Sequence, residues 1–158
     1  MIQIAKHYGF APIMTTASPK HADYLKSLGA THVLDRRTPE ESLVSEIQGL
    51  TSKPIQIAYD AVGAISQAYI DLLGPGGDFI LADPEVFDRG LKFDEGKKPL
   101  IVGGVAHGFK EFGASLFEKF EELLERGVIK VCTAVRFVVA YKAYDHGIVC
   151  ISRSASKN

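Results

Sequence analysis

The stretch Ala11-Pro12-Ile13-Met14-Thr15-Thr16-Ala17-Ser18-Pro19-Lys20 decides the fold class. Its first six residues form a short β-prone run that predicts a strand. Ser18 and Pro19 supply the N-cap and first turn of a helix, and Gly29 predicts where that helix ends. The apolar residues between them share one helical face, namely Ala22, Leu25 and Leu28. A strand that passes directly into an amphipathic helix is the repeating unit of a parallel sheet covered by helices.

The same alternation continues along the chain. Apolar runs bounded by turn residues predict further strands at 31–35, 54–59, 79–82 and 99–103. Helical periodicity predicts a helix that ends near Gly9, one that opens with a Thr38/Glu41 capping box, one over 65–73 that stops at Gly74-Pro75-Gly76-Gly77, and one over 112–124. The polar segment 83–98 predicts a mobile surface loop, and 128–151 is β-prone. We therefore expect one α/β domain over residues 1–151 and a frayed tail at 152–158.

Composition narrows the classes of function. The 158 residues carry a formal net charge of −1 and are 46% hydrophobic, which gives a core but no basic face for nucleic acid or an acidic membrane. No apolar run approaches the roughly 20 residues that span a bilayer, and the first residues do not resemble a signal peptide. Cys132 and Cys150 lack metal-binding spacing and fit reduced, buried thiols. We expect a cytoplasmic protein whose partners are small molecules or proteins.

Candidate binding residues follow the carboxyl ends of the strands, because ligands of open parallel sheets bind there. Thr16, Ser18 and Lys20 follow the first strand without a carboxylate among them, and Arg36 with Arg37 ends the next. Hydroxyl and cationic groups in these places favour the 2′-phosphate of NADP over the bare ribose of NAD. The alternative is that Ser18 only caps its helix and Lys20 is only a solvated side chain.

Two later loops carry the remaining candidates. Asp60, Val62 and Gly63 lie where a strand passes into a helix, and their small neighbours let a ligand approach the backbone. A capping role is the simpler interpretation of Asp60. His107 lies in the glycine-flanked loop after the strand at 99–103, where an ordinary loop histidine is the better interpretation. The histidines show no metal-ligand spacing, so we expect no metal, and the motifs of esterases, phosphotransferases and glycosidases are absent.

Several of these segments together resemble one protein family. They are Ile2-Gln3-Ile4-Ala5-Lys6, Thr15-Thr16-Ala17-Ser18-Pro19-Lys20-His21, Tyr24 to Asp35, Tyr59-Asp60-Ala61-Val62-Gly63 and Gly74-Pro75-Gly76-Gly77. In that order they resemble the coenzyme domain of medium-chain dehydrogenases/reductases. The likeness covers most of residues 1–127 and is closest to fungal members of the zinc-independent branch, which includes quinone oxidoreductases and enoyl reductases. It implies a Rossmann-like, mostly parallel sheet flanked by helices and an NADPH-dependent oxidoreductase.

The resemblance also implies roles for single residues. Ser18 and Lys20, next to Thr16, fall where the family holds the NADPH 2′-phosphate, and Arg36 falls beside the adenosine. Asp60, Val62 and Gly63 would lie along the cofactor. The loop that contains Gly104 and His107 would approach the nicotinamide. No catalytic residue is identified.

The chain departs from the family where a first strand, a glycine-rich phosphate loop and a separate catalytic domain are expected. We therefore expect weak or absent NADP(H) binding and little activity of the chain alone, because the pyrophosphate loses backbone donors worth roughly 1.5–3 kcal/mol each. The alternative is a non-enzymatic binding protein built on a degenerate Rossmann domain.

The missing strand would leave a gap between the strands at Ala11 and Ile55. Three segments are candidates to fill this gap: residues 148–151, residues 131–139, or a strand of a second copy. The last would make a homo-oligomer by strand exchange.

Overall fold

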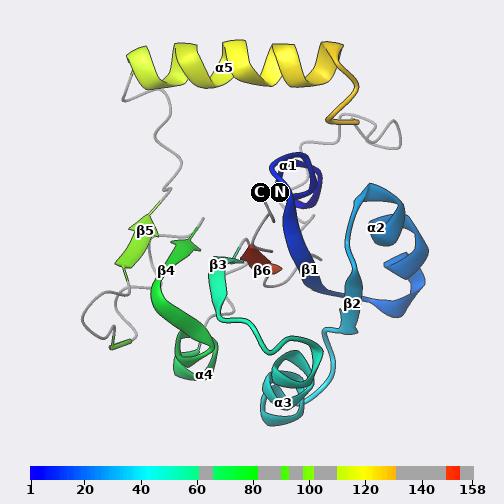
Figure 1. The fold of residues 1–158 in the computed structure, drawn as a ribbon, viewed down its shortest axis with the longest axis vertical. Helices are drawn as coiled ribbons and strands as arrows, with labels where there is room; N and C mark the ends of the chain where they lie inside the picture. The colour runs from blue at the N-terminus through cyan, green and yellow to red at the C-terminus, as the bar shows by residue number, and fades with distance from the viewer. Residues whose placement is uncertain (61–65, 82–89, 93–97, 102–109, 131–148, 154–158) are drawn as a thin grey trace.

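The computed structural model describes residues 1–60, 66–81, 90–92, 98–101, 110–130 and 149–153. Within these residues six strands form one sheet, in the order β2-β1-β6-β3-β4-β5 (Figure 1). The strands are β1 (Phe10–Ala17), β2 (His32–Asp35), β3 (Ile55–Asp60), β4 (Leu73–Leu81), β5 (Lys98–Ile101) and β6 (Val149–Arg153). Five of them run parallel, and β6 runs antiparallel to both of its neighbours. The Rossmann-like, mostly parallel α/β fold expected from the sequence is confirmed.

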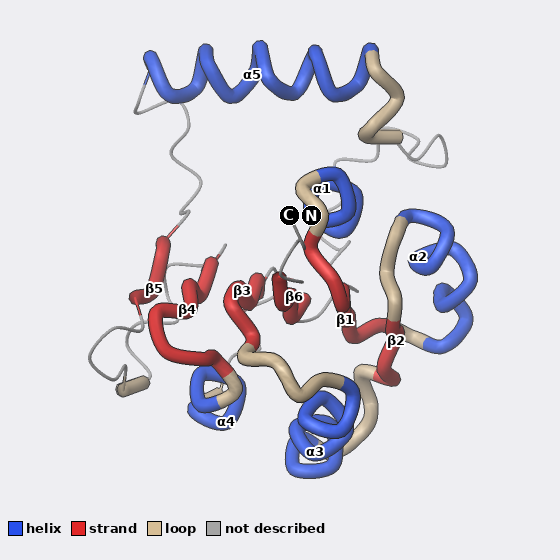
Figure 2. Tube along the Cα trace, viewed as in Figure 1, coloured by secondary structure: helices blue, strands red, loops and turns tan. Residues whose placement is uncertain are grey.

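Helices cover both faces of the sheet (Figure 2). They are α1 (Ile2–His7), the short 3-10 turn η1 (Pro19–His21), α2 (Ala22–Leu28), α3 (Glu40–Leu50), α4 (Gln67–Asp71) and α5 (Lys110–Glu125). Successive residues of β1 point to opposite faces. Ile13 packs against Ala5 of α1, whereas Met14 packs in the cluster that includes Leu43 of α3. The sheet is therefore the middle layer, with α1 and α2 on one face and α3 and α4 on the other.

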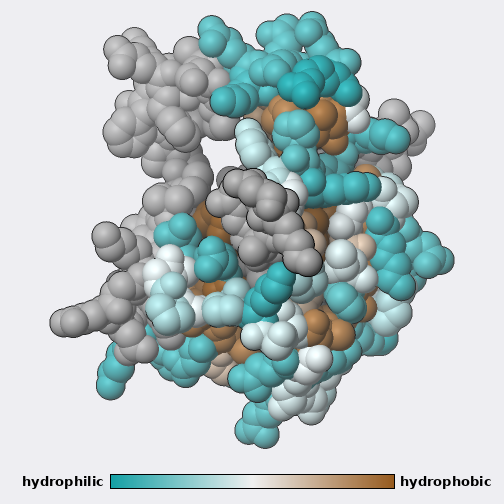
Figure 3. Space-filling view, viewed as in Figure 1, coloured by the Kyte–Doolittle hydropathy of each residue, from teal (hydrophilic) through white to brown (hydrophobic). Residues whose placement is uncertain are grey.

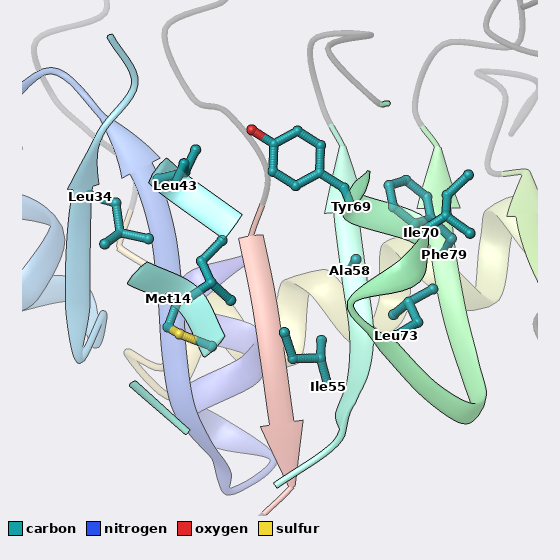
Figure 4. Close-up of a cluster of buried hydrophobic side chains, with 10 residues drawn as sticks. Met14, Leu34, Leu43, Ile55, Ala58, Tyr69, Ile70, Leu73 and Phe79 are labelled. Atoms are coloured by element: carbon teal, nitrogen blue, oxygen red, sulfur yellow. The ribbon is translucent and has the colours of Figure 1, made fainter. Parts of the chain in front are cut away.

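The larger core lies between the sheet and the pair α3 and α4. Figure 4 shows side chains from β1 to β4 meeting those of these two helices. The buried members are Met14, Leu34, Leu43, Ile47, Ile55, Ala58, Tyr69, Ile70, Leu73 and Phe79. Phe79 is fully buried, and burying a side chain of this size stabilises the fold by about 2–3 kcal/mol. This cluster fixes the strands whose carboxyl ends carry the candidate site.

α5 lies beyond α1, away from the sheet (Figure 1). Leu123 is buried, whereas Phe120 and Leu124 are exposed. Figure 3 shows an apolar patch along the C-terminal half of this helix. Gly127, with φ of +66°, turns the chain after α5, and its N–H donates to the Leu124 carbonyl.

The gap between β1 and β3 is filled by β6 of the same chain. Ile151 lies opposite Ile13 of β1 and Ile57 of β3, and Cys150 lies opposite Met14 and Ala58. The segment 148–151 is therefore the candidate that the structure selects, while residues 131–139 lie outside the described part. Because β6 closes the gap within one chain, the sheet gives no reason for strand exchange, and a homo-oligomer stays a prediction.

The sequence predicts a frayed tail from residue 152, but β6 continues past this residue. Ser152 and Arg153 belong to β6, and Arg153 pairs with Phe10 across a shift in register. The ladder with β1 thus holds the chain for two residues beyond the expected boundary at residue 151.

The prediction of a Thr38/Glu41 capping box is wrong. α3 starts at Glu40, after Pro39, without a side-chain cap. The Thr38 N–H instead donates to the Asp35 carbonyl at 2.9 Å. This turn after β2 places Thr38 outside the helix.

The segment Gly74-Pro75-Gly76-Gly77 was expected as a turn between a helix and a strand, but it lies inside β4. The register with β3 shifts there, from Ile55 opposite Leu73 to Ile57 opposite Asp78. A Cβ at Gly74 would lie 2.3 Å from Pro54 Cβ, so only glycine permits this approach of the two backbones. The glycines therefore form a bulge, as extra strand residues do.

Candidate functional site

The carboxyl ends of β1, β2 and β3 lie at one edge of the sheet. Ala17 is opposite Asp35, so the loops that follow β1 and β2 start side by side. Thr15 and Tyr59 both lie opposite Val149 of β6, which brings Thr16 and Asp60 to the same level. The structure therefore gathers Thr16, Ser18, Lys20, Arg36 and Asp60 along this edge.

The loop after β1 presents Ser18 and Lys20. The Ser18 backbone is extended, and its carbonyl accepts the His21 N–H at 2.9 Å. The Ser18 side chain makes no capping hydrogen bond to η1, so the capping role considered from the sequence is not observed. Lys20 is exposed, and no carboxylate of the described residues pairs with it.

The loop after β2 is tied to the loop after β1. The Arg36 N–H donates to the Ala17 carbonyl at 3.1 Å, which extends the β1–β2 pairing beyond the last ladder pair. The Arg36 side chain is exposed. Backbone pairing thus places Arg36 next to the residue that precedes Ser18.

Asp35 and Arg37 form a pair beside this edge. The Asp35 carboxylate accepts the Arg37 backbone N–H at 3.0 Å and its side-chain Nε and Nη2 at 3.3 and 3.2 Å. Hydrogen bonds from the Arg37 side chain and backbone hold the pKa of Asp35 below its ordinary value, and the carboxylate raises the pKa of Arg37. Arg37, which the sequence suggested as a second cation for a phosphate, is therefore already paired.

Buried polar groups lie behind the exposed ones. Asp60 at the end of β3 is fully buried, and Thr16 is 5% exposed. Ser66, which directly precedes α4, has a buried hydroxyl oxygen without a hydrogen-bond partner in the described part of the chain. The exposed and half-exposed groups at this edge are therefore those of Ser18, Lys20 and Arg36.

Four of the residues expected at the site lie outside the described residues: Val62, Gly63, Gly104 and His107. Two features of the edge were not identified from the sequence, the Asp35–Arg37 pair and the buried hydroxyl of Ser66. The spacing Asp-x-Arg at a strand end was the available signal for the first. Nothing in the sequence distinguishes Ser66 from an ordinary helix-capping serine.

The chemistry of the donor set fits a phosphate-bearing nucleotide. An ammonium, a guanidinium and a hydroxyl on adjacent loops are the donors that bind a phosphate monoester through charge-assisted hydrogen bonds. Two carboxylates lie in this region: Asp35 is ion-paired with Arg37, and Asp60 is fully buried behind the exposed groups. The ion pair limits the repulsion between Asp35 and such a ligand. Among the described residues there is no group of three or more His, Cys, Asp or Glu side chains that could hold a metal ion.

The family model of zinc-binding dehydrogenases matches residues 1–84, more than half of the chain. The chain belongs to this family. It forms the coenzyme domain of the medium-chain dehydrogenases/reductases, as the resemblance of the sequence implied.

The chain is similar in sequence to individual oxidoreductases and reductases. It is 38% identical over 63 residues to a probable quinone oxidoreductase of Leishmania amazonensis, covering 39% of this chain and 18% of the relative. It is 33% identical over 86 residues to a trans-enoyl reductase of Macrophomina phaseolina, covering 52% of this chain and 23% of the relative. The domain thus spans about a fifth of the length of these relatives.

A solved structure shows the same fold. The mycobacterial protein Rv1454c, in complex with NADPH, superposes with a TM-score of 0.59 at 23% identity, over 83% of this chain and 42% of that protein. In the described part of the domain no helix is both long and apolar enough to cross a membrane.

Proposed function

We propose that this chain is the NADP(H)-binding domain of a reductase of the enoyl or quinone type. The observation that carries the proposal is the backbone link between Arg36 and Ala17, because it places Arg36 beside the loop of Ser18 and Lys20 at the carboxyl edge of the sheet. The enoyl and quinone reductases among its relatives support the same assignment.

Each exposed residue has a role in this proposal. The Ser18 hydroxyl and the Lys20 ammonium bind the 2′-phosphate, and the Arg36 guanidinium packs beside the adenosine. Arg37 keeps Asp35 ion-paired, which limits the repulsion between that carboxylate and the phosphate. Thr16 and Asp60 are buried behind these exposed groups and help to hold the carboxyl edge of the sheet in place. Val62, Gly63, Gly104 and His107 lie outside the described residues, and the family resemblance alone suggests for them a place along the cofactor toward the nicotinamide.

NADPH supplies a hydride when it is bound. We propose weak or no turnover by this chain alone, because the residues above bind the cofactor and none of them is assigned a catalytic step. Substrate choice and catalysis then depend on segments of a longer reductase, such as the relatives of which this chain spans about a fifth.

A second candidate function, a non-enzymatic binding protein, is favoured by β6. This strand runs antiparallel at the centre of the sheet, so no strand–turn–helix unit connects it to α1. Such a unit is where Rossmann domains bind a pyrophosphate. On this alternative the edge retains affinity for an anion without selecting NADPH.

Isothermal titration calorimetry with NADPH and NADH distinguishes the two. We expect tighter binding of NADPH and about a tenfold loss of that preference in Lys20→Ala, the lower end for one charge-assisted hydrogen bond at an exposed site. Lys53→Ala is the matched control, since Lys53 is also exposed but lies before β3, away from this edge. Equal or absent binding of both nucleotides would support the non-enzymatic alternative.

A further inference from the structure

A cavity lies at the opposite edge of the sheet from the proposed nucleotide site. It has a volume of about 420 Å³ and opens between the C-terminal ends of α1 and α2 and the segment that follows α5. Figure 2 shows this segment descending from α5 toward α1. The lining residues are Gln3, Lys6, His7, Ser27, Leu28, Gly127, Val128 and Lys130. Because α1 leads into the start of β1, this edge holds the amino ends of the parallel strands.

The lining is cationic. It contains the side chains of Lys6, His7 and Lys130, the neutral hydrogen-bonding groups of Gln3 and Ser27, and no carboxylate. The chain as a whole has a formal charge of −1, so this concentration of basic groups is local. Among the described residues no carboxylate pairs with either lysine or with His7. Unpaired cations around a concave site attract an anion.

Hydrogen bonds hold the wall that carries Lys130. The Lys130 N–H donates to Gln3 Oε1 at 2.7 Å, and Gln3 Nε2 donates back to the Lys130 carbonyl at 3.3 Å. One step earlier, the N–H groups of Val128 and Ile129 both donate to the Leu123 carbonyl, at 2.9 and 3.2 Å. The two bonds of Gln3 connect residues far apart in the sequence, and they place the Lys130 backbone beside α1 before any ligand arrives.

The wall that carries Lys6 is held by packing of this side chain against Gly29. Gly29 has a φ of +121°, and a Cβ at this position would lie 2.6 Å from Lys6 Cδ. The aliphatic part of Lys6 therefore crosses directly over Gly29, which restricts its rotamers. Packing therefore restrains the stem of Lys6, and hydrogen bonds restrain the backbone of Lys130. Such a cavity binds an ion with a smaller loss of entropy than two lysines on mobile segments would.

We propose that this cavity binds a small soluble phosphate monoester. Two ammonium groups match the two negative charges of such a ligand, and the Gln3 amide, the Ser27 hydroxyl and His7 can complete its hydrogen bonds. The volume lies within the range of small-molecule sites. The proposal is independent of the proposed NADP(H) site, because no residue is shared between the two.

The simplest alternative is that Lys6 and His7 only complement the dipole at the C-terminal end of α1. The carbonyls of Ile4 and Lys6 there already accept the N–H groups of Tyr8 and Gly9. This alternative explains the presence of Lys6 and His7 in the lining. It does not explain Lys130, which belongs to another segment and is brought to the cavity by Gln3.

Titration of the ¹⁵N-labelled full chain with phosphoserine tests the proposal. We expect saturable shifts of the amides of Gly29, Gly127 and Lys130, with a dissociation constant of about 1 mM or lower. Lys6→Gln and Lys130→Gln should each weaken binding about tenfold. Lys26→Gln is the matched control: this exposed lysine is on α2, does not line the cavity and should leave binding unchanged.

Three outcomes would overturn the proposal. The first is the absence of saturable shifts at these amides, and the second is an equal loss of affinity in Lys26→Gln and Lys6→Gln. The third is sedimentation of the protein with phosphatidic acid vesicles in the absence of phosphoserine binding, which would assign the cavity to a membrane headgroup. Lys20→Gln should not change these shifts, so failure here is distinguishable from failure of the NADP(H) proposal.

Discussion

Replacing Ile151 by proline should open the sheet at its centre. Ile151 lies opposite Ile13 on one side and Ile57 on the other, so β6 is the only described connection between the pair β2-β1 and the trio β3-β4-β5 within the sheet. Proline removes one N–H from the ladder, which costs about 1 kcal/mol. It also leaves a carbonyl unpaired inside the sheet, which costs about 1–3 kcal/mol.

The sum, about 2–4 kcal/mol, is a large part of the 5–15 kcal/mol by which a domain is usually stable. With a urea dependence of about 2 kcal/mol per molar, the unfolding midpoint should fall by about 1–2 M. Circular dichroism during urea titration measures this midpoint. Ser156→Pro, beyond the end of β6, is the control and should leave the midpoint unchanged.

An unchanged midpoint in Ile151→Pro would refute the placement of β6. Sedimentation equilibrium adds a second criterion. If the wild-type chain is a dimer that Ile151→Pro converts to a monomer, a strand of a second copy occupies the gap instead.

Three further predictions concern single residues. Gly29→Ala should destabilise the domain by about 1–2 kcal/mol, because alanine is strained at a φ of +121° and its Cβ would meet Lys6. Thr31→Val should cost about 2 kcal/mol in urea unfolding, because the Thr31 hydroxyl accepts an N–H of β1 at 2.9 Å and donates to a carbonyl of β1 at 2.8 Å. Carboxyl NMR should give Asp35 a pKa below the ordinary value of an aspartate, and Arg37→Gln should return the pKa toward that value. Because this pKa is lowered by folding, the stability from the pair is present above the ordinary Asp pKa and is lost as the pH falls through the lowered value.

The glycine and threonine substitutions each have a matched comparison. Gly9→Ala keeps the positive φ, but no atom lies within 4 Å of the new Cβ, so it should cost less than Gly29→Ala. Thr38→Val should cost less than Thr31→Val, because Thr38 is held by its backbone N–H alone among the bonds described. Equal costs within either pair, or an Asp35 titration that ignores Arg37→Gln, would contradict the contacts on which these predictions rest.

The order of strands and helices could be predicted because its signals are local. The run from Ala11 to Lys20 contains a strand, a turn and the start of a helix in ten residues, and β1, η1 and α2 follow it closely. The Thr38/Glu41 capping box failed for an equally local reason, since a turn with Asp35 uses the Thr38 N–H first. Competing local hydrogen bonds decide such boundaries.

The occupant of the central gap could not be predicted, because it depends on pairing between distant segments. Residues 131–139 and 148–151 are both β-prone, and only the register of Ile151 with Ile13 and Ile57 distinguishes them. The candidate site likewise has one part that could be predicted from local signals and one part that could not. Its position at the carboxyl edge followed from the alternation of strands and helices, whereas the pairing of Arg37 with Asp35 depends on the conformation of the turn.

The most direct test of the NADP(H) proposal is to map the amide shifts that NADPH causes in the ¹⁵N-labelled chain. We predict saturable shifts at Ser18, Lys20 and Arg36 that are larger with NADPH than with NADH, and no shift at Gly29 or Gly127 of the opposite edge. Equal shifts with both nucleotides, or shifts confined to the opposite edge, would contradict the assignment of the carboxyl edge as an NADP(H) site.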